Sequence, residues 1–244
     1  MKASELEDGE GRGADIAYVM PSHQYPMGTV MSVRRRQELL SWACRKEDRY
    51  LIEDDYDSEF RYKGKPIPAL QGMDQNGRVI YMGTFSKSIA PAIRIGFLVL
   101  PEALLKLYRE KAGFFSSTVS RLDQNILYQF LTEGHNERPL NRMRAVYKGK
   151  HHNLLGGLLG GFEKVFSIGG EHAGLHVLPT DRTGRHTEEE LERTAAEKGI
   201  GVYGLSRYFM HPEQNSYPRT VLLGYASLSG EEIERGLKGL REAW

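Results

Sequence analysis

Residues 79–96 of this 244-residue chain read Val-Ile-Tyr-Met-Gly-Thr-Phe-Ser-Lys-Ser-Ile-Ala-Pro-Ala-Ile-Arg-Ile-Gly. The first four residues form an apolar run that is typical of a buried strand. The run ends in a turn that presents the hydroxyls of Thr84 and Ser86 and the amine of Lys87, and Arg94 follows. A single loop lysine is most often solvated. Hydroxyls, an arginine and a lysine together can hold a phosphate group beside a reactive amine.

The composition limits the class of protein. Hydrophobic residues make up 40% and charged residues 27% of the chain, as in ordinary soluble globular proteins. Thirty-three basic against thirty-two acidic side chains leave a formal net charge of +1, which excludes a broad basic surface for nucleic acid. The run Arg34-Arg35-Arg36 is therefore predicted to lie on the solvated face of a helix.

Cysteine use and hydropathy indicate the compartment. A single cysteine, Cys44, excludes an internal disulfide and favours a reducing setting. No apolar run approaches the roughly 18 residues of a membrane span, and the N-terminus lacks the apolar core of a signal peptide. We therefore expect a cytoplasmic protein without membrane contact.

The first part of the chain alternates apolar strands with helical patterns. Ser32 is the expected N-cap of a helix that reaches about residue 46. Apolar runs predict strands at residues 15–20, 50–52, 79–82 and 95–100. This order predicts an α/β protein with a mostly parallel sheet, whose ligands collect at the strand ends. His23, Asp54 and Lys87 each come just after one of these strands.

The second part is predicted to contain shorter strands beside helices. A long helical pattern from about residue 140 ends in a glycine-rich segment, residues 156–161, that weakens it. Capping-box pairs are expected to start two later helices, Thr187 with Glu190 and Ser229 with Glu232. We therefore predict three regions: a flexible lead-in over residues 1–14, part of a large domain over 15–134, and a smaller C-terminal α+β subdomain over 135–244.

Lys87 has the surroundings of an amine that forms an imine with an aldehyde. A nearby cation and partial burial both lower the pKa of a lysine and keep the attacking amine neutral. Thr84, Ser86 and Arg94 would serve as phosphate ligands, because a guanidinium fork matches phosphate oxygens.

The neighbouring strand end supplies an acid. Asp54 can keep a pyridine nitrogen protonated, so that the ring acts as an electron sink. Tyr56, two residues on, can hydrogen-bond the ring hydroxyl. An acidic strand end followed by a strand end with Thr-x-Ser-Lys and an arginine is a specific pattern for pyridoxal phosphate.

Three segments, residues 21–28, 52–62 and 84–96, resemble the aminotransferase-like effector domain of MocR-type transcriptional regulators of the GntR family, in particular the GabR-like members that respond to γ-aminobutyrate. The resemblance implies a fold-type I pyridoxal-phosphate-dependent transferase, with a partial large-domain sheet and a smaller C-terminal subdomain. It also implies that Lys87 forms the imine, that Asp54 and Tyr56 contact the ring, and that Thr84, Ser86 and Arg94 surround the phosphate.

The resemblance implies partners as well. An arginine of the C-terminal subdomain would grip the carboxylate of the amino-acid effector; Arg207 is the first choice and Arg219 the second. Related aminotransferases place an asparagine at the ring hydroxyl where this chain has Tyr25, so Tyr25 or His23 is expected there. The complete protein is expected to be a homodimer that contacts DNA only through a winged-helix domain, which this chain, truncated on its N-terminal side, lacks.

Three functions stay open. The leading one is an effector-sensing and dimerising domain that is not an enzyme. A true aminotransferase would use the same lysine for proton transfer, and a fragment without a competent cofactor site is the third. No metal site is expected, because the acidic residues at 54–59 lack the spacing of a calcium loop and the pair His151-His152 has no further ligands at the spacing of a metal site.

Overall fold

The computed structural model describes residues 2–9, 11–62, 67–135, 137–172, 174–211 and 215–244. These residues form two compact units. The first unit takes its described residues from 2–24, 30–59 and 67–142, and the second from 25–29, 60–62 and 143–244. The main part of the second unit starts at residue 143. The boundary between residues 134 and 135 stays a prediction.

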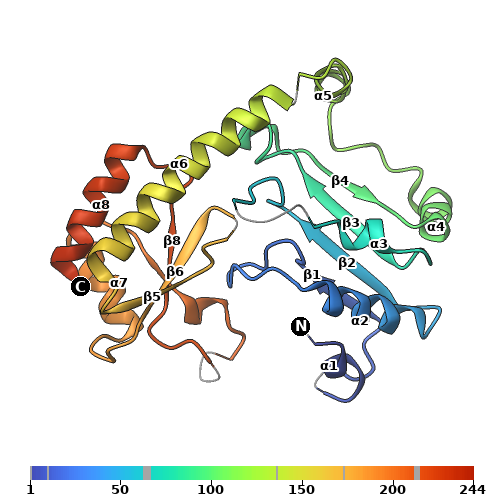
Figure 1. The fold of residues 1–244 in the computed structure, drawn as a ribbon. Helices are drawn as coiled ribbons and strands as arrows, with labels where there is room; N and C mark the ends of the chain where they lie inside the picture. The colour runs from blue at the N-terminus through green and yellow to red at the C-terminus, as the bar shows by residue number, and fades with distance from the viewer. Residues whose placement is uncertain (1, 10, 63–66, 136, 173, 212–214) are drawn as a thin grey trace. The chain divides into compact units, whose positions relative to one another are not determined.

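Four strands form the sheet of the first unit (Figure 1). Across the sheet they are β1 (Ile16–Val19), β2 (Tyr50–Asp55), β3 (Val79–Thr84) and β4 (Gly96–Val99). The first three strands are parallel, and β4 runs antiparallel to β3. The predicted α/β sheet, mostly parallel, is thereby confirmed. The carboxyl ends of β1, β2 and β3 meet at one edge of this sheet.

Helix α2 (Val33–Cys44) packs its apolar face on the sheet (Figure 1). As predicted, the Ser32 hydroxyl caps the helix by accepting a hydrogen bond from a backbone N–H of the first turn. Leu39, Trp42 and Ala43 are fully buried. They share a core with Leu6, Ala17, Val19, Leu51, Leu70 and Val79. Leu6 joins this core through α1 (Ala3–Glu7), a short helix within the region predicted as a lead-in.

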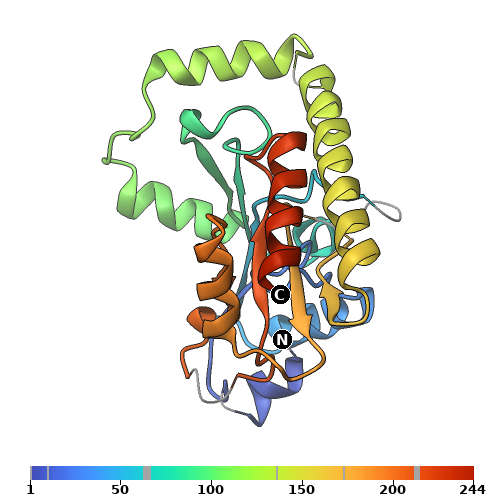
Figure 2. The same ribbon diagram turned by 90° about the vertical axis from the view of Figure 1, so that its left-hand side faces the viewer.

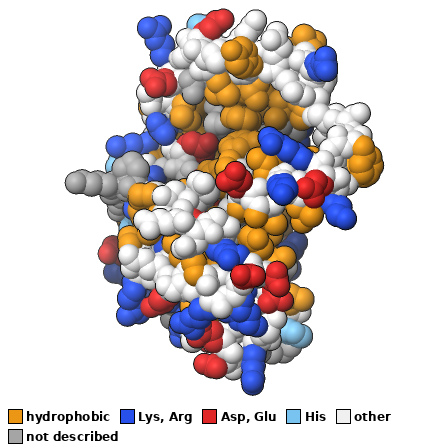
Figure 3. Space-filling view, turned by 90° about the vertical axis from the view of Figure 1, so that its right-hand side faces the viewer, with side chains coloured by type: hydrophobic (Ala, Val, Ile, Leu, Met, Phe, Trp, Pro, Cys, Tyr) orange, Lys and Arg blue, Asp and Glu red, His pale blue; other side chains and the backbone are white. Residues whose placement is uncertain are grey.

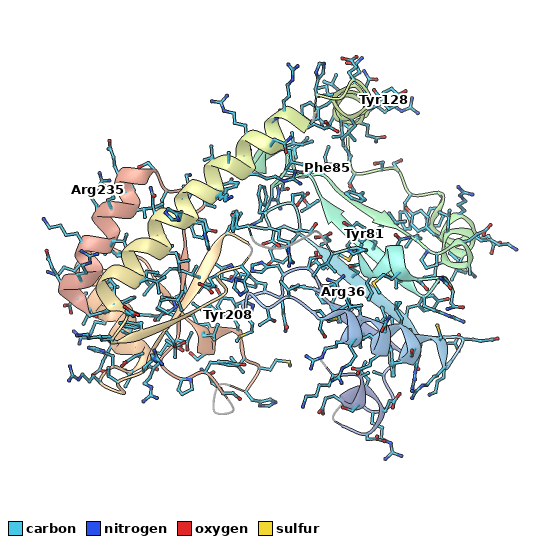
Figure 4. All side chains as sticks on the ribbon, viewed as in Figure 1. Arg36, Tyr81, Phe85, Tyr128, Tyr208 and Arg235 are labelled. Atoms are coloured by element: carbon cyan, nitrogen blue, oxygen red, sulfur yellow. The ribbon has the colours of Figure 1, made fainter. Side chains whose placement is uncertain are left out.

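The prediction of a solvated arginine run is wrong for its third member. Arg36, labelled in Figure 4, is fully buried. Its guanidinium donates to three backbone carbonyls, those of Pro68 (2.7 Å), Pro21 (2.8 Å) and Met31 (3.2 Å). Arg34, by contrast, is 86% exposed. The buried side chain therefore ties the loop after β1 to the loop before α3 (Leu70–Met73).

One side of the first unit is apolar and uncovered. β4, α4 (Glu102–Ala112) and α5 (Arg121–Thr132) are described throughout, and none of their residues is buried. The large exposed hydrophobic residues there include Phe97, Leu98, Leu107, Tyr108, Leu122 and Ile126. Figure 3 shows hydrophobic side chains gathered at the surface on the side where β4 and α4 lie. The short helix η1 (Pro91–Ile93) precedes β4.

The second unit has an antiparallel sheet. Its strands lie in the order β5 (Phe166–Gly169), β6 (His176–Asp181), β8 (Val221–Gly224) and β7 (Tyr203–Gly204). Its helices are most of α6 (Glu137–Phe162), α7 (Glu188–Glu197), α8 (Gly230–Ala243) and the short η2 (Leu205–Tyr208). Both predicted capping boxes, at the starts of α7 and α8, are present. The predicted α+β architecture of this part is confirmed.

Two of the glycines of α6 are explained by the approach of α8, which lies beside it (Figures 1 and 2). A Cβ atom at Gly157 would lie 2.2 Å from a methyl carbon of Leu237, and one at Gly161 would lie 2.5 Å from Nε of Arg241. Gly156 has open space around it. Gly157 and Gly161 therefore permit a close helix contact, at the cost in helix propensity noted above.

Asp181 organises the turn after β6. Its buried carboxylate accepts hydrogen bonds from the backbone N–H groups of Thr183 (2.7 Å) and His186 (2.9 Å). Burial by itself raises the pKa of Asp181, but a 2.7 Å hydrogen bond from the Thr183 hydroxyl and the two backbone hydrogen bonds outweigh it and hold that pKa below its usual range. Among the described residues, no helix is long and apolar enough to cross a membrane.

Candidate functional site

The side chains predicted to hold a cofactor come from the shared edge of the three parallel strands. β2 ends in Asp54 and Asp55, and Tyr56 follows. β3 ends at Thr84, and the lysine turn follows. Parallel alignment places these ends beside one another, with Asp54 opposite Met82. The site is therefore assembled by the topology of the sheet, as expected for an open α/β fold.

Lys87 lies against Tyr56. Its Nζ is 5.6 Å from the centre of the tyrosine ring, within the range of a cation–π contact. The Tyr56 hydroxyl oxygen is 3.0 Å from Nδ1 of His23, and the same nitrogen is 2.8 Å from Oδ2 of Asp57. The structure thus brings together three of the predicted residues and adds Asp57, to which the sequence analysis assigned no role.

Asp54 has a partner that the sequence analysis missed. The hydroxyl of Tyr18, from β1, donates a hydrogen bond to its carboxylate. Partial burial, together with this hydrogen bond, raises the pKa of Tyr18 to about 12. The signal was present in the strand pattern, because Tyr18 pairs with Ile52 and therefore points to the same face of the sheet as Asp54.

The acidic side chains on either side of Asp54, those of Glu53 and Asp55, point to the other face of the sheet and have structural roles. The carboxylate of Asp55 accepts a 2.7 Å hydrogen bond from the hydroxyl of Tyr81. Burial, and secondly this hydrogen bond, raise the pKa of the Tyr81 phenol. Glu53 is fully buried and accepts 2.8 Å hydrogen bonds from the backbone N–H groups of Leu70 and Gln71 at the start of α3. Neither carboxylate is available to a ligand at the strand edge.

The turn predicted to bind phosphate is closed by its own hydrogen bonds. The Thr84 hydroxyl oxygen accepts from the backbone N–H of Ser86 at 3.2 Å and donates to the carbonyl of Ile95 at 3.3 Å. Phe85, labelled in Figure 4, packs its ring against Phe97 with 5.2 Å between centroids. The turn is therefore held against β4.

Arg94 has an unusual backbone. Its φ of 49° lies in the left-handed region, and its side chain is exposed. Among the described residues, Arg94 and Arg219 (φ 63°) are the two non-glycine residues with positive φ. Such backbone strain persists mainly at functional positions, where the surrounding structure holds it in place.

Tyr25 lies in the second unit. Its hydroxyl donates to that of Tyr208 at 2.9 Å, and its ring packs edge-on against Tyr208 and His176. Partial burial, with the Tyr208 hydrogen bond, raises the pKa of Tyr25 to about 12. These contacts all lie within the second unit, so the predicted contact of Tyr25 with a cofactor ring stays a prediction.

The two predicted effector arginines differ in their surroundings. Arg207, in η2, pairs with Glu192 of α7 at 2.7 Å, which raises the pKa of its exposed guanidinium. Arg219 precedes β8, and its Nη1 lies 2.9 Å from where a Cβ of Gly184 would be. Within the part of the chain that the structure describes, no ion pair involves Arg219.

The chain resembles regulators and enzymes of known sequence. It is 42% identical to an uncharacterized HTH-type transcriptional regulator, YhdI, of Bacillus subtilis, over 94% of this chain and 48% of that protein. It is 36% identical to the probable rhizopine catabolism regulatory protein MocR of Rhizobium meliloti, over 98% of this chain and 48% of the relative. The chain therefore spans about half the length of these relatives. The resemblance to MocR-type regulators is confirmed.

The fold is that of an aminotransferase. The structure superimposes on the multiple substrate aminotransferase from Thermococcus profundus with a TM-score of 0.85 and 27% identity, over 99% of this chain and 58% of the enzyme. The fold-type I prediction is confirmed, and pyridoxal phosphate is the cofactor that this fold implies. The sequence pattern of aminotransferase class I and II matches residues 16–240. The chain belongs to the aminotransferase class I and II family.

Proposed function

We propose that this chain is the effector-sensing and dimerising part of a MocR-type regulator, which binds pyridoxal phosphate through Lys87 and an amino acid such as γ-aminobutyrate. The observation that carries the proposal is the position of the Lys87 amine over the Tyr56 ring, at the edge where Asp54 also lies. The similarity to the HTH-type transcriptional regulator YhdI and to the regulatory protein MocR supports a regulatory role. Contact with DNA in the cytoplasm, through a separate winged-helix domain, is part of the same proposal.

The residues present fit pyridoxal phosphate in their chemistry. The edge of the sheet offers an amine for the aldehyde, a carboxylate for the pyridine nitrogen and a phenol for the ring hydroxyl, from Lys87, Asp54 and Tyr56. Hydroxyls and a guanidinium for the phosphate come from Thr84, Ser86 and Arg94. The strained backbone of Arg94 is consistent with a guanidinium held in place for a ligand.

Each group has a distinct task in the proposal. When bound, the cofactor supplies an aldehyde that exchanges one amine for another and so makes the site responsive to amino acids. Lys87 supplies the resident amine. Asp54, oriented by the Tyr18 hydroxyl, would hold the ring nitrogen protonated. Tyr56 would donate to the ring hydroxyl from its position beside the lysine.

For the carboxylate of the effector, we now favour Arg219 over Arg207. The Arg207 guanidinium is already paired with Glu192, so a carboxylate ligand would have to displace that partner. Arg219 has no such ion pair in the described residues, and its left-handed backbone resembles that of Arg94. A fork of two N–H groups suits a carboxylate.

An aminotransferase is the second candidate, favoured by the close structural match to an enzyme. Sensor and enzyme share the same residues, so turnover has to separate them. The protein is mixed with pyridoxal phosphate, γ-aminobutyrate and 2-oxoglutarate, and glutamate is measured. A sensor gives at most one equivalent of glutamate per site, and sustained multiple turnovers would refute the sensing role.

Cofactor binding is tested by absorbance with added pyridoxal phosphate, before and after borohydride reduction. We expect an absorbance band at about 420 nm, which is typical of a lysine–aldehyde adduct. We also expect borohydride to trap this adduct in the unmodified protein and not in Lys87→Ala. Lys148→Ala, on the exposed surface of α6, is the matched control. An adduct that persists in Lys87→Ala would show that another amine carries the cofactor.

A further inference from the structure

A buried ionisable pair lies directly behind Tyr56. The side chains of His23 and Asp57 are 1% and 2% exposed, and Nδ1 of the histidine is 2.8 Å from Oδ2 of the aspartate. His23 follows β1 and Asp57 follows β2, and the fold brings them together across 34 positions of sequence. Burying two such groups is costly unless their hydrogen bonds are well satisfied. The cofactor roles assigned above make no use of Asp57.

The contacts of this pair assign the position of a proton. A neutral imidazole nitrogen carries either one hydrogen or one lone pair. When the carboxylate of Asp57 is the acceptor of the 2.8 Å contact, the hydrogen of that contact lies on Nδ1 of His23. The Tyr56 oxygen, 3.0 Å from the same nitrogen, then faces an N–H group as an acceptor. The hydroxyl hydrogen of Tyr56 is thereby not used by His23.

We propose that His23 and Asp57 are positioning residues, which hold the Tyr56 phenol beside Lys87, where its hydroxyl would contact the bound cofactor. This inference rests on the proposed binding of pyridoxal phosphate at Lys87. His23 then acts through Tyr56, in place of the direct cofactor contact that the sequence suggested. Asp57 acts one step further back, by fixing the tautomer of His23.

The tautomer can be measured without any cofactor. ¹⁵N NMR of the histidine ring, assigned with His23→Asn, reports which nitrogen carries hydrogen. We expect Nδ1–H in the unmodified protein and a loss of this preference in Asp57→Leu, because leucine removes the acceptor that holds the hydrogen on Nδ1. An Nε2–H tautomer in the unmodified protein, or an unchanged Nδ1–H tautomer in Asp57→Leu, would overturn the inference.

A double-mutant cycle tests the coupling to Tyr56. Asp57→Asn and Tyr56→Phe are each expected to weaken pyridoxal phosphate binding about tenfold, the scale of one hydrogen bond. The double variant is also expected to lose about tenfold, because both changes remove the same interaction. Independent losses that multiply to about a hundredfold would show that Asp57 does not act through Tyr56. Asp48→Asn, on an exposed side chain, is the control.

Conservative replacement separates positioning from folding. In His23→Asn the amide N–H takes roughly the place of Nδ1–H and can still donate to Asp57, so this variant should keep most of the affinity for pyridoxal phosphate. His23→Leu has no such donor and should lose about tenfold in affinity. Equal affinities in the two variants would contradict the inference. Absence of a borohydride-reducible adduct in the unmodified protein would instead refute the proposed function. If the adduct forms but the affinity losses of Asp57→Asn and Tyr56→Phe multiply, only the role of the His23–Asp57 pair is refuted.

Discussion

Replacement of Arg36 by methionine is expected to destabilise the first unit strongly. Methionine matches the aliphatic part of the arginine side chain, so the change removes the guanidinium and keeps most of the apolar packing. Two of the three carbonyl contacts, to Pro68 and Pro21, are short at 2.7 and 2.8 Å. Hydrogen bonds to charged groups contribute about 1.5 to 3 kcal/mol each, and the 3.2 Å contact to Met31 less. We therefore expect a loss of about 3 to 5 kcal/mol in the free energy of unfolding.

Urea unfolding followed by the fluorescence of Trp42 measures this change, because that tryptophan lies on the buried face of α2, in the core of the first unit. The control comes from the same arginine run. Arg34 is 86% exposed and pairs with Glu38 of its own helix, so Arg34→Met should change the unfolding free energy by less than about 0.5 kcal/mol. If both variants lost similar amounts, the burial argument for Arg36 would be refuted.

Three further outcomes are expected. Gly157→Ala should lower the stability because its Cβ would collide with the Leu237 side chain of α8, whereas Gly156→Ala, in open space, should raise it by about 0.5 to 1 kcal/mol. Thermal unfolding compares the two variants, and stability changes of the same sign in both would contradict the close approach of α8. The pKa of Asp181 is lowered on folding, so its stabilisation is full above about pH 4 and is lost as pH falls through the folded pKa. Asp181→Asn should therefore flatten the acid limb of a stability–pH curve, and an unchanged limb would exclude that residue as its origin. Arg219→Ala should weaken the response to γ-aminobutyrate about tenfold or more while Arg207→Ala changes it little, as titration of the absorbance band would show; the reverse ranking would restore Arg207.

Local patterns determined much of this protein. The strands end where apolar runs meet polar turns, and the caps at Ser32, Thr187 and Ser229 follow rules that involve only four consecutive residues. The lysine turn and the acidic strand end could be matched to pyridoxal phosphate for the same reason, because each is a short motif at the end of a single strand.

Tertiary structure decided which member of a local pattern is used. Three consecutive arginines look alike in sequence, yet only packing shows that Arg36 is buried by carbonyls from segments up to 32 residues away. The pairing of Tyr18 with Asp54, of Asp57 with His23 and of Arg207 with Glu192 likewise joins distant segments.

The strand-end motif around residues 79–96 thus specified the chemistry on offer at the site. The topology of the sheet determined which side chains surround Lys87, and in particular that Tyr56 lies under its amine with a buried histidine and aspartate behind it. The physical reason is that a motif fixes the backbone over a few residues, whereas the environment of a side chain depends on long-range packing that no local pattern encodes.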